Sequence, residues 1–213
     1  MEKLVVFKGL VVPVDMRDVD TDQIVPRQFL KLINRDGFGQ YLFYHHRYDE
    51  RGNPTRDFVL QQPQYSNATI LLARENFRCG SSREHAAWAL LDYGFRVLIA
   101  PSFADIFKNN CFKNGMLPVE LERETVAEWF KRVEGIPGYE ITLDLPNQTL
   151  TGTDGFSCSF EVDPFHKRCL MEGLDDISLT LNERSAIEAY EKAHREPWQA
   201  FLTKTGHDSE VGQ

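Results

Sequence analysis

Five consecutive side chains combine the groups needed to hold an anion and to act on it. Ser81 and Ser82 supply hydroxyls, Arg83 a guanidinium, Glu84 a carboxylate and His85 an imidazole. The guanidinium offers a two-pronged donor that matches a carboxylate or a phosphate. If a helix begins at these residues, its unpaired N–H groups and the positive end of its dipole also favour an anion. The residue types therefore predict an anion site with a hydroxyl beside it.

A strand-to-helix turn must position these groups. Residues 69–73 form an apolar, β-prone run before the stretch, and a helical pattern over residues 84–93 follows it and ends near Gly94. Ser81 or Ser82 is suited to be the N-cap of that helix. Taken alone, the stretch is better explained as a serine cap followed by solvated charges.

The pattern around this turn predicts a parallel sheet. Strands are expected at residues 96–100 and 116–121, and a second helix at residues 101–110 with Ser102 as its cap. Strand and helix thus alternate from residue 69 to residue 121, which implies right-handed crossovers. The serine loop then lies at the carboxyl end of a strand, where open α/β sheets bind their ligands.

The rest of the chain predicts a mixed fold in a single domain, residues 1–202, with a flexible tail at residues 203–213. One or two strands are expected within residues 4–14, and three short strands after residue 138 are separated by turn residues and read as antiparallel. The expected elements are the strands 139–145, 148–152 and 156–163 and the helices 124–134, 164–170 and 183–196.

Composition excludes several classes of protein. The chain has 213 residues, 42% of them apolar, and 24 basic against 32 acidic residues give a net charge of −8. No basic patch favours nucleic acid, and no apolar run approaches the roughly 18 residues needed to cross a bilayer. The first residues lack the pattern of a signal peptide. We therefore expect a cytoplasmic protein that binds neither nucleic acid nor a membrane.

No metal site is expected on this chain. Its four cysteines, Cys79, Cys111, Cys158 and Cys169, form no C-x-x-C pair, which argues against a zinc or iron–sulfur site. The alternating aspartates of residues 18–22 resemble the start of a calcium loop, but glutamine and phenylalanine occupy the glycine and final acidic positions. Residues 26–58 are rich in aromatics and predict an ordered lid or docking surface.

Residues 80–86, Gly-Ser-Ser-Arg-Glu-His-Ala, resemble the signature of the swivelling domain of the aconitase superfamily. The whole chain resembles the family of bacterial small subunits of 3-isopropylmalate dehydratase. Two positions depart from that pattern, Arg78 in place of glycine and Ala87 in place of proline, and Arg78 puts the local loop geometry in doubt. Further similarity lies at residues 20–26, 102–107, 114–115, 163–165 and 173–180.

The resemblance implies a three-layer β/β/α swivelling domain with a mostly parallel sheet and an antiparallel C-terminal part. It implies half of an enzyme, a hydro-lyase active only with a large subunit. That partner would carry a [4Fe–4S] cluster, and this chain would hold no cofactor. The implied reaction isomerises 2-isopropylmalate to 3-isopropylmalate through isopropylmaleate, in leucine biosynthesis, on a small dicarboxylate substrate.

The resemblance also implies roles for single residues. Ser81 matches the serine that removes a proton next to a carboxylate, and Asp22 matches an acidic residue near the active site. Arg83 matches the arginine that clamps a substrate carboxylate. Ser82 lines the same turn, and Lys31 lies where the superfamily places substrate-binding residues. The implied catalytic residues are Ser81 and Asp22; the implied substrate-binding residues are Arg83, Ser82 and Lys31.

Two other functions stay open. Small subunits of citraconate/methylmalate and homoaconitate hydratases are similar, and Arg27 and Arg35 could serve a substrate with a further carboxylate. A non-catalytic carboxylate-binding module could use the same fold. A serine–histidine hydrolase is strongly disfavoured, because the chain lacks the G-x-S-x-G elbow and Ser81 and His85 would lie a turn apart on one helix start.

Overall fold

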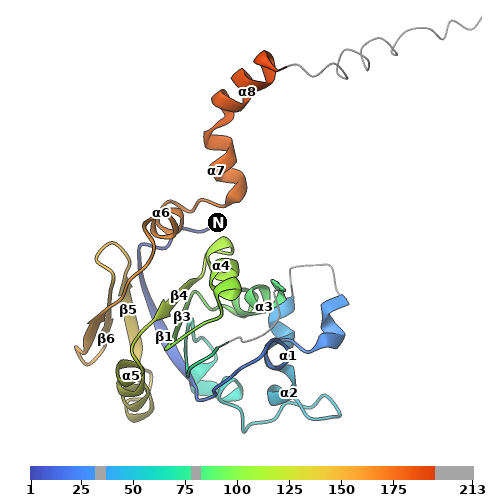
Figure 1. The fold of residues 1–213 in the computed structure, drawn as a ribbon. Coiled ribbons are helices and arrows are strands. Elements are labelled where there is room, and N and C mark those ends of the chain that lie inside the picture. Colours follow the sequence, from blue (N-terminus) through green and yellow to red (C-terminus); the bar gives the residue numbers. More distant parts are fainter. Residues whose placement is uncertain (32–36, 78–82, 195–213) are drawn as a thin grey trace, which may run out of the picture. The chain divides into compact units, whose positions relative to one another are not determined.

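A computed structural model describes residues 1–31, 37–77 and 83–194 of the chain. The chain divides into two compact units, Met1–Asp175 and Asp176–Gln213. The first unit contains the whole sheet (Figure 1). The predicted domain boundary at residue 202 and the predicted tail lie outside the described residues.

The sheet has seven strands in the order β4-β3-β2-β1-β5-β6-β7. Strands β1 to β4 are parallel to one another, and β5, β6 and β7 are antiparallel. This arrangement confirms the predicted parallel sheet with an antiparallel C-terminal part. The strands are β1 (Val6–Val14), β2 (Ile70–Ala73), β3 (Val97–Ala100), β4 (Leu117–Glu120), β5 (Glu140–Asp144), β6 (Thr149–Gly152) and β7 (Ser157–Ser159).

Strand β1 belongs to both parts of the sheet. Its first half, residues 6–10, pairs antiparallel with β5, whereas residues 11–14 pair parallel with β2. Gly9 suits the close approach to the residue before β2, since a Cβ there would force the Thr69 hydroxyl to move. One strand therefore joins the two sets of strands.

Two apolar cores lie on opposite faces of the parallel strands. The alternation of a strand sends Leu71 into one core and Leu72 into the other, and both are fully buried. Helices α3 (His85–Tyr93) and α4 (Asp105–Lys113) fill the first core. Helix α5 (Arg123–Gly135) and the antiparallel strands fill the second. The result is the predicted order of layers, β/β/α.

The sequences of α3 and α5 explain which faces they bury. Alanines and a leucine of α3 pack on the sheet, and Gly94 ends the helix in the left-handed conformation at φ 116°. Helix α5 buries Val126, Trp129, Phe130 and Val133, which recur at the spacing of one helical face. Both helices form because an apolar stripe matches the sheet beneath it.

Short helices connect β1 to β2, and three longer ones follow β7. In the described ranges no helix is long and apolar enough to cross a membrane. The single helix predicted at residues 183–196 begins at Arg184, and a separate helix precedes it. The remaining helices are α1 (Thr21–Ile24), η1 (Arg27–Lys31), η2 (Phe38–Tyr41), α2 (Tyr44–Arg47), η3 (Val59–Gln61), η4 (Pro63–Tyr65), α6 (Pro164–Glu172), α7 (Asp176–Asn182) and α8 (Arg184–Ala193).

Candidate active site at the carboxyl ends of the parallel strands

The loops that follow β2 and β3 remain aligned beyond the ends of these strands. Phe77 forms a parallel bridge with Phe103, and the Phe77 N–H donates to the Ser102 carbonyl at 3.2 Å. The Asn76 N–H donates to the Ser102 Oγ atom at 2.9 Å. The chain is therefore fixed next to the β3 loop at the point where it enters residues 78–82.

The predicted capping role of Ser102 is wrong. Helix α4 begins at Asp105, and its N-cap residue is Ala104, which makes no side-chain cap bond. The Ser102 hydroxyl instead accepts the Asn76 N–H. Because the loop after β2 uses this hydroxyl, the helix starts two residues later than a cap at Ser102 would place it.

The alternating aspartates of residues 18–22 have three different partners. Asp18 accepts a hydrogen bond from the Asn76 side chain at 2.7 Å. Asp20 caps α1 by accepting the Gln23 N–H at 2.8 Å. Asp22, in the first turn of α1, pairs with Arg27 at 2.6 Å on the surface.

The start of α3 connects the candidate site to the end of α4. Glu84 is the N-cap residue of α3 but does not cap it, because its carboxylate accepts from the Asn114 Nδ2 atom at 2.6 Å. Asn114 also donates to the Asn110 carbonyl at 2.8 Å. The predicted caps, Ser81 and Ser82, lie outside the described residues. Arg83 is exposed just before this turn.

His85 is a packing group at the same turn. Its ring lies 4.7 Å from the Trp88 ring and 5.4 Å from the Phe38 ring, centroid to centroid. Burial, and then the charge of Arg83, lower the pKa of His85, so the imidazole is neutral at pH 7. Within the described part of the chain the buried Nδ1 atom has no hydrogen-bond partner.

The aromatic segment after β1 packs directly on α3. The Gly39 N–H donates to the Asp92 carboxylate at 2.7 Å. A Cβ on Gly39 would lie 2.7 Å from the Tyr93 backbone nitrogen, so only glycine allows this approach. Phe29 of η1 stacks on Tyr41 of η2 at 4.1 Å. The described part of the predicted lid is thus an ordered surface against α3.

Of the predicted site residues, the structure describes Asp22, Lys31 and Arg83, whereas Ser81 and Ser82 lie outside the described residues. Helix α1, which carries Asp22, contacts α3, which follows Arg83 (Figure 1). Lys31 is exposed at the end of η1. No hydrogen bond or ion pair between the side chains of Asp22, Lys31 and Arg83 is found among the described residues, and Asp22 pairs with Arg27 instead.

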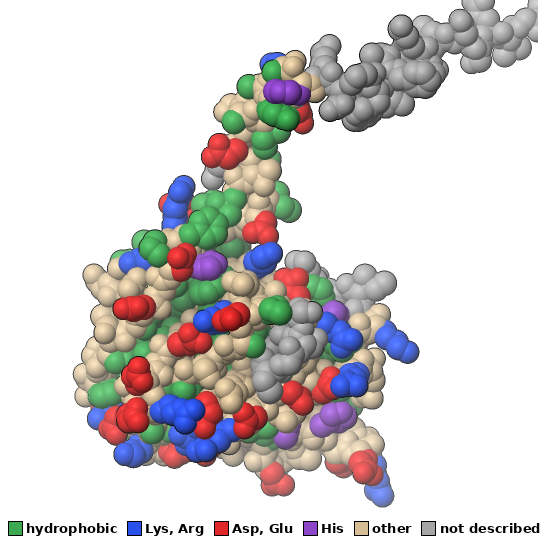
Figure 2. Space-filling model, in the orientation of Figure 1, with side chains coloured by type: hydrophobic (Ala, Val, Ile, Leu, Met, Phe, Trp, Pro, Cys, Tyr) green, Lys and Arg blue, Asp and Glu red, His purple; other side chains and the backbone are tan. Residues whose placement is uncertain are grey.

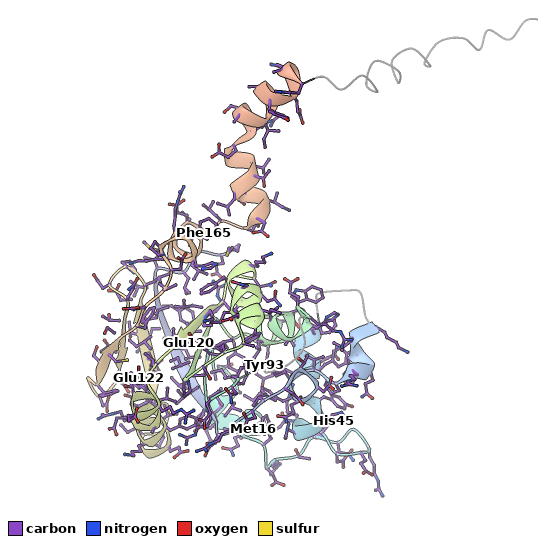
Figure 3. All side chains as sticks on the ribbon, viewed as in Figure 1. Met16, His45, Tyr93, Glu120, Glu122 and Phe165 are labelled. Carbon is purple, nitrogen blue, oxygen red and sulfur yellow. The ribbon has the colours of Figure 1, made fainter. Side chains whose placement is uncertain are left out.

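Two open hollows lie near the carboxyl ends of the strands. The larger has a volume of about 410 Å³ and is lined by Ser102, Glu120 and Glu122 among others; Figure 3 labels both glutamates. The smaller, about 280 Å³, adjoins it across Pro101. Asp22, Lys31 and Arg83 line neither of them.

The described residues offer no ready metal site. Nowhere in residues 1–31, 37–77 and 83–194 do three histidine, cysteine or acidic side chains gather around a common point. Cys111 and Cys169 are buried, and burial raises the pKa of the Cys158 thiol, which disfavours the thiolate that a metal needs. Cys79 lies outside the described residues.

The visible surface is mixed in charge. Figure 2 shows lysine and arginine side chains interspersed with aspartate and glutamate on this face. No large basic field of the kind used to bind nucleic acid is present on it.

Comparisons of the whole sequence give a consistent answer. The family model described as the aconitase C-terminal domain matches residues 1–124, and a model described as LeuD_N matches residues 127–164. A 3-isopropylmalate dehydratase small subunit of Brevibacillus brevis is 56% identical over 191 residues, covering 90% of this chain and 98% of the relative. One of Magnetococcus marinus is 54% identical over 213 residues, covering 95% of this chain and all of the relative.

A solved structure has a similar fold. The crystal structure of 3-isopropylmalate dehydratase from Methanocaldococcus jannaschii matches with a TM-score of 0.63 and 24% sequence identity. The match covers 88% of this chain and 99% of the other.

Proposed function

Because this chain belongs to the family of 3-isopropylmalate dehydratase small subunits, we propose that it supplies proton-transfer and substrate-binding groups to a two-subunit hydro-lyase. The reaction isomerises 2-isopropylmalate to 3-isopropylmalate through isopropylmaleate. A small subunit implies a large subunit as its partner. The observation that carries the proposal is the placement of Arg83 and α3 at the carboxyl ends of the parallel strands, beside α1 with Asp22.

Each group has a defined task in this proposal. Ser81 removes the proton next to a substrate carboxylate, and Arg83 binds a carboxylate through its guanidinium. Ser82 and Lys31 bind the substrate. Asp22 is the acidic catalytic residue near the reacting atoms. Arg83 is exposed, which leaves it accessible to an anionic ligand.

The energetics of Ser81 require a second body. A serine alcohol is about as weak an acid as water, so its pKa lies far above 7. Lowering that pKa by roughly 8 costs about 11 kcal/mol. A helix N-terminus contributes at most ~2 kcal/mol, and oxyanion-type N–H donors contribute about 3–4 kcal/mol. The isolated chain therefore falls short, and a cationic, water-free site formed with a partner must supply the remainder.

We assign the metal centre of the reaction to the partner. The described residues of this chain do not fit a [4Fe–4S] cluster, since they bring no set of three potential ligands together. A cluster on the large subunit would act as a Lewis acid toward the substrate when bound. The tasks of this chain are to bind the substrate, orient it and move a proton.

The surroundings of Lys31 favour a branched apolar side chain on the substrate. Phe29 and Tyr41 stack beside η1, and Tyr44 adds a third ring 5.0 Å from Phe29. A tricarboxylate would need a further cation here. Arg27, four residues before Lys31, pairs with Asp22, and Arg35, four residues after Lys31, lies outside the described residues.

Reconstitution tests the proposal. The purified chain, mixed anaerobically with its large subunit, should convert 2-isopropylmalate to 3-isopropylmalate, and neither protein alone should do so. Conversion is measured by chromatography of the two isomers. Turnover by the isolated chain without iron would contradict the assignment of roles to the two subunits.

Ser81→Ala separates catalysis from assembly. The variant should lose at least about 10³-fold in kcat because it lacks the proton acceptor, while co-elution with the large subunit is retained. Ser66→Ala, an exposed serine far along the chain from the candidate site, is the matched control and should keep full activity. Equal activity of the Ser81→Ala complex and the control would remove Ser81 from the mechanism.

A further inference from the structure

Arg47 is a buried cation at the end of α2, with only 8% of its surface exposed. Its Nη1 atom donates to the carbonyls of Gly39 and Leu42 at 3.1 Å each, and to that of Gln40 at 3.5 Å. Its Nη2 atom donates to the Tyr48 hydroxyl at 3.3 Å. The guanidinium thus replaces its lost hydration mainly with backbone oxygens of η2.

No carboxylate neutralises this charge within residues 1–31, 37–77 and 83–194. Two aromatic rings take that place: the Arg47 Cζ atom lies 5.0 Å from the Tyr93 ring centroid and 5.2 Å from that of Tyr48. A ring face attracts a cation without an acidic partner. Burying an arginine without an acidic partner costs free energy. The burial of Arg47 is therefore better explained by a role in connecting several elements through its guanidinium than by stability alone.

The bonds of Arg47 connect the elements that carry the predicted substrate groups. The carbonyl at Gly39 belongs to the residue that packs on the Asp92 and Tyr93 end of α3. The next residue after Leu42 is Phe43, whose N–H donates to the Ile24 carbonyl of α1 at 2.7 Å. The guanidinium therefore fixes the backbone that lies between α1 and α3.

The backbone of Arg47 fixes the other side of the segment. Its carbonyl accepts from the Thr55 N–H at 2.8 Å and from the Gln61 side chain at 3.1 Å. Tyr93, labelled in Figure 3, closes the arrangement by donating its hydroxyl to the Leu60 carbonyl at 3.2 Å. Side chain and backbone together make Arg47 a junction of η2, η3 and α3.

We propose that Arg47 is a positioning residue, which sets the spacing of Asp22 and Lys31 from Arg83 by tying η2 to α3 and, through Phe43, to α1. This inference rests on the proposed function of those three residues. Arg47 itself touches no substrate. Its planar fork is needed because one nitrogen must reach two backbone oxygens while the ring faces of Tyr48 and Tyr93 remain in contact.

Arg47→Lys is the sharp test in the assembled complex. Lysine keeps the charge but offers a point donor, so the substrate groups lose their fixed spacing while the fold persists. The KM for 2-isopropylmalate should rise about tenfold, with kcat within about threefold of the wild type. A merely structural role would instead lower the melting temperature and the active fraction and leave KM unchanged.

Arg47→Met and Arg168→Met form the matched pair of charge deletions. Arg168 is exposed and pairs with Glu172 inside α6, so its replacement should leave KM unchanged. Arg47→Met should raise KM at least as much as Arg47→Lys. A KM unchanged in every folded Arg47 variant would overturn the proposal.

Amide hydrogen exchange decides the question without relying on turnover. In the Arg47→Lys chain, exchange should accelerate about tenfold in residues 21–31 and 37–48 and stay unchanged in α5. Unchanged exchange in both segments would overturn the positioning role even if the complex is active. If Arg47→Lys accelerates exchange but the wild-type complex does not convert isopropylmalate, the link made by Arg47 is supported and the proposed reaction is contradicted.

Discussion

Glu84 directs its carboxylate to Asn114 at the end of α4, whereas the neighbouring Arg83 is exposed. The 2.6 Å bond from Asn114 joins the first turn of α3 to the last turn of α4 across 30 positions of sequence. The start of α3, which follows the serine loop in sequence, and the Asn114–Gly115 pair are thereby part of one local structure. Glu84 is best understood as a support of the anion site.

Removing that bond should loosen the start of α3. We expect Asn114→Ala to cost about 1.5–3 kcal/mol of unfolding free energy, because a carboxylate loses its donor. The assembled enzyme should lose activity, because residues 81–83 precede this turn. Urea unfolding of the chain and steady-state kinetics of the complex measure the two effects.

Asn147→Ala is the control for this prediction. Asn147 donates to the Asp144 carboxylate at 2.9 Å, a similar bond in the turn after β5. Its loss should lower stability without altering KM or kcat. Identical kinetics for the two variants would show that Glu84 does not support the site.

At the scale of elements, the contact between η2 and α3 depends on Gly39, which has no side chain. Gly39 → Ala would place a methyl group 2.7 Å from the Tyr93 nitrogen and 2.9 Å from the Asp92 carbonyl carbon. Backbone atoms of a packed helix cannot move aside as a flexible side chain can. The aromatic segment and α3 must therefore separate or shift together.

Gly39→Ala should lower the unfolding free energy by about 1–3 kcal/mol through overpacking. Gly135→Ala is the matched change, since a Cβ on Gly135 meets nothing within 4 Å and lies at the end of α5. That variant should be neutral or more stable by roughly 0.5–1 kcal/mol. Thermal and urea unfolding of both variants provide the comparison. Equal stability would show that η2 can move away from α3 at little cost in free energy.

For the whole molecule, acid should lower stability before its carboxylates titrate. Burial lowers the pKa of His85 and of His46 below the ordinary value of 6.5. The unfolded chain therefore binds more protons than the folded chain between pH 6.5 and the lowered values. Stability present above pH 6.5 is lost as the pH falls through that window.

His85→Phe should flatten this loss, because phenylalanine keeps the stacking on Trp88 and Phe38 but cannot bind a proton. Urea unfolding at pH 7.5, 6.5 and 5.5 measures the slope for both chains. His46→Phe should flatten it further, since His46 stacks on Phe58 at 5.2 Å. A slope unaffected by either change would mean that other groups bind the protons.

Much of this architecture could be predicted from local pattern. The strands and helices between residues 69 and 121 follow from apolar runs that alternate with helical spacing, and the structure has them within a few residues, α4 excepted. The cap prediction for Ser102 is wrong because its hydroxyl accepts the backbone N–H of Asn76, which lies in another loop. Arg47 gave no signal, since only the folded chain shows that an arginine is buried among carbonyls. In both cases the partners are known only once the chain is folded, although those of Arg47 include carbonyls only five and eight residues away in sequence.

Strand β1 divides its hydrogen bonds between neighbours made at very different times during synthesis. Its second half finds β2 within about 60 residues of translation, but its first half has no neighbour until β5 emerges, more than 120 residues later. The nascent polypeptide therefore exposes one unpaired β-edge for most of its production, which invites association with other chains. Chaperones that shield residues 6–10 should therefore raise the soluble yield of this subunit, whereas slow translation should lower it by prolonging the exposure.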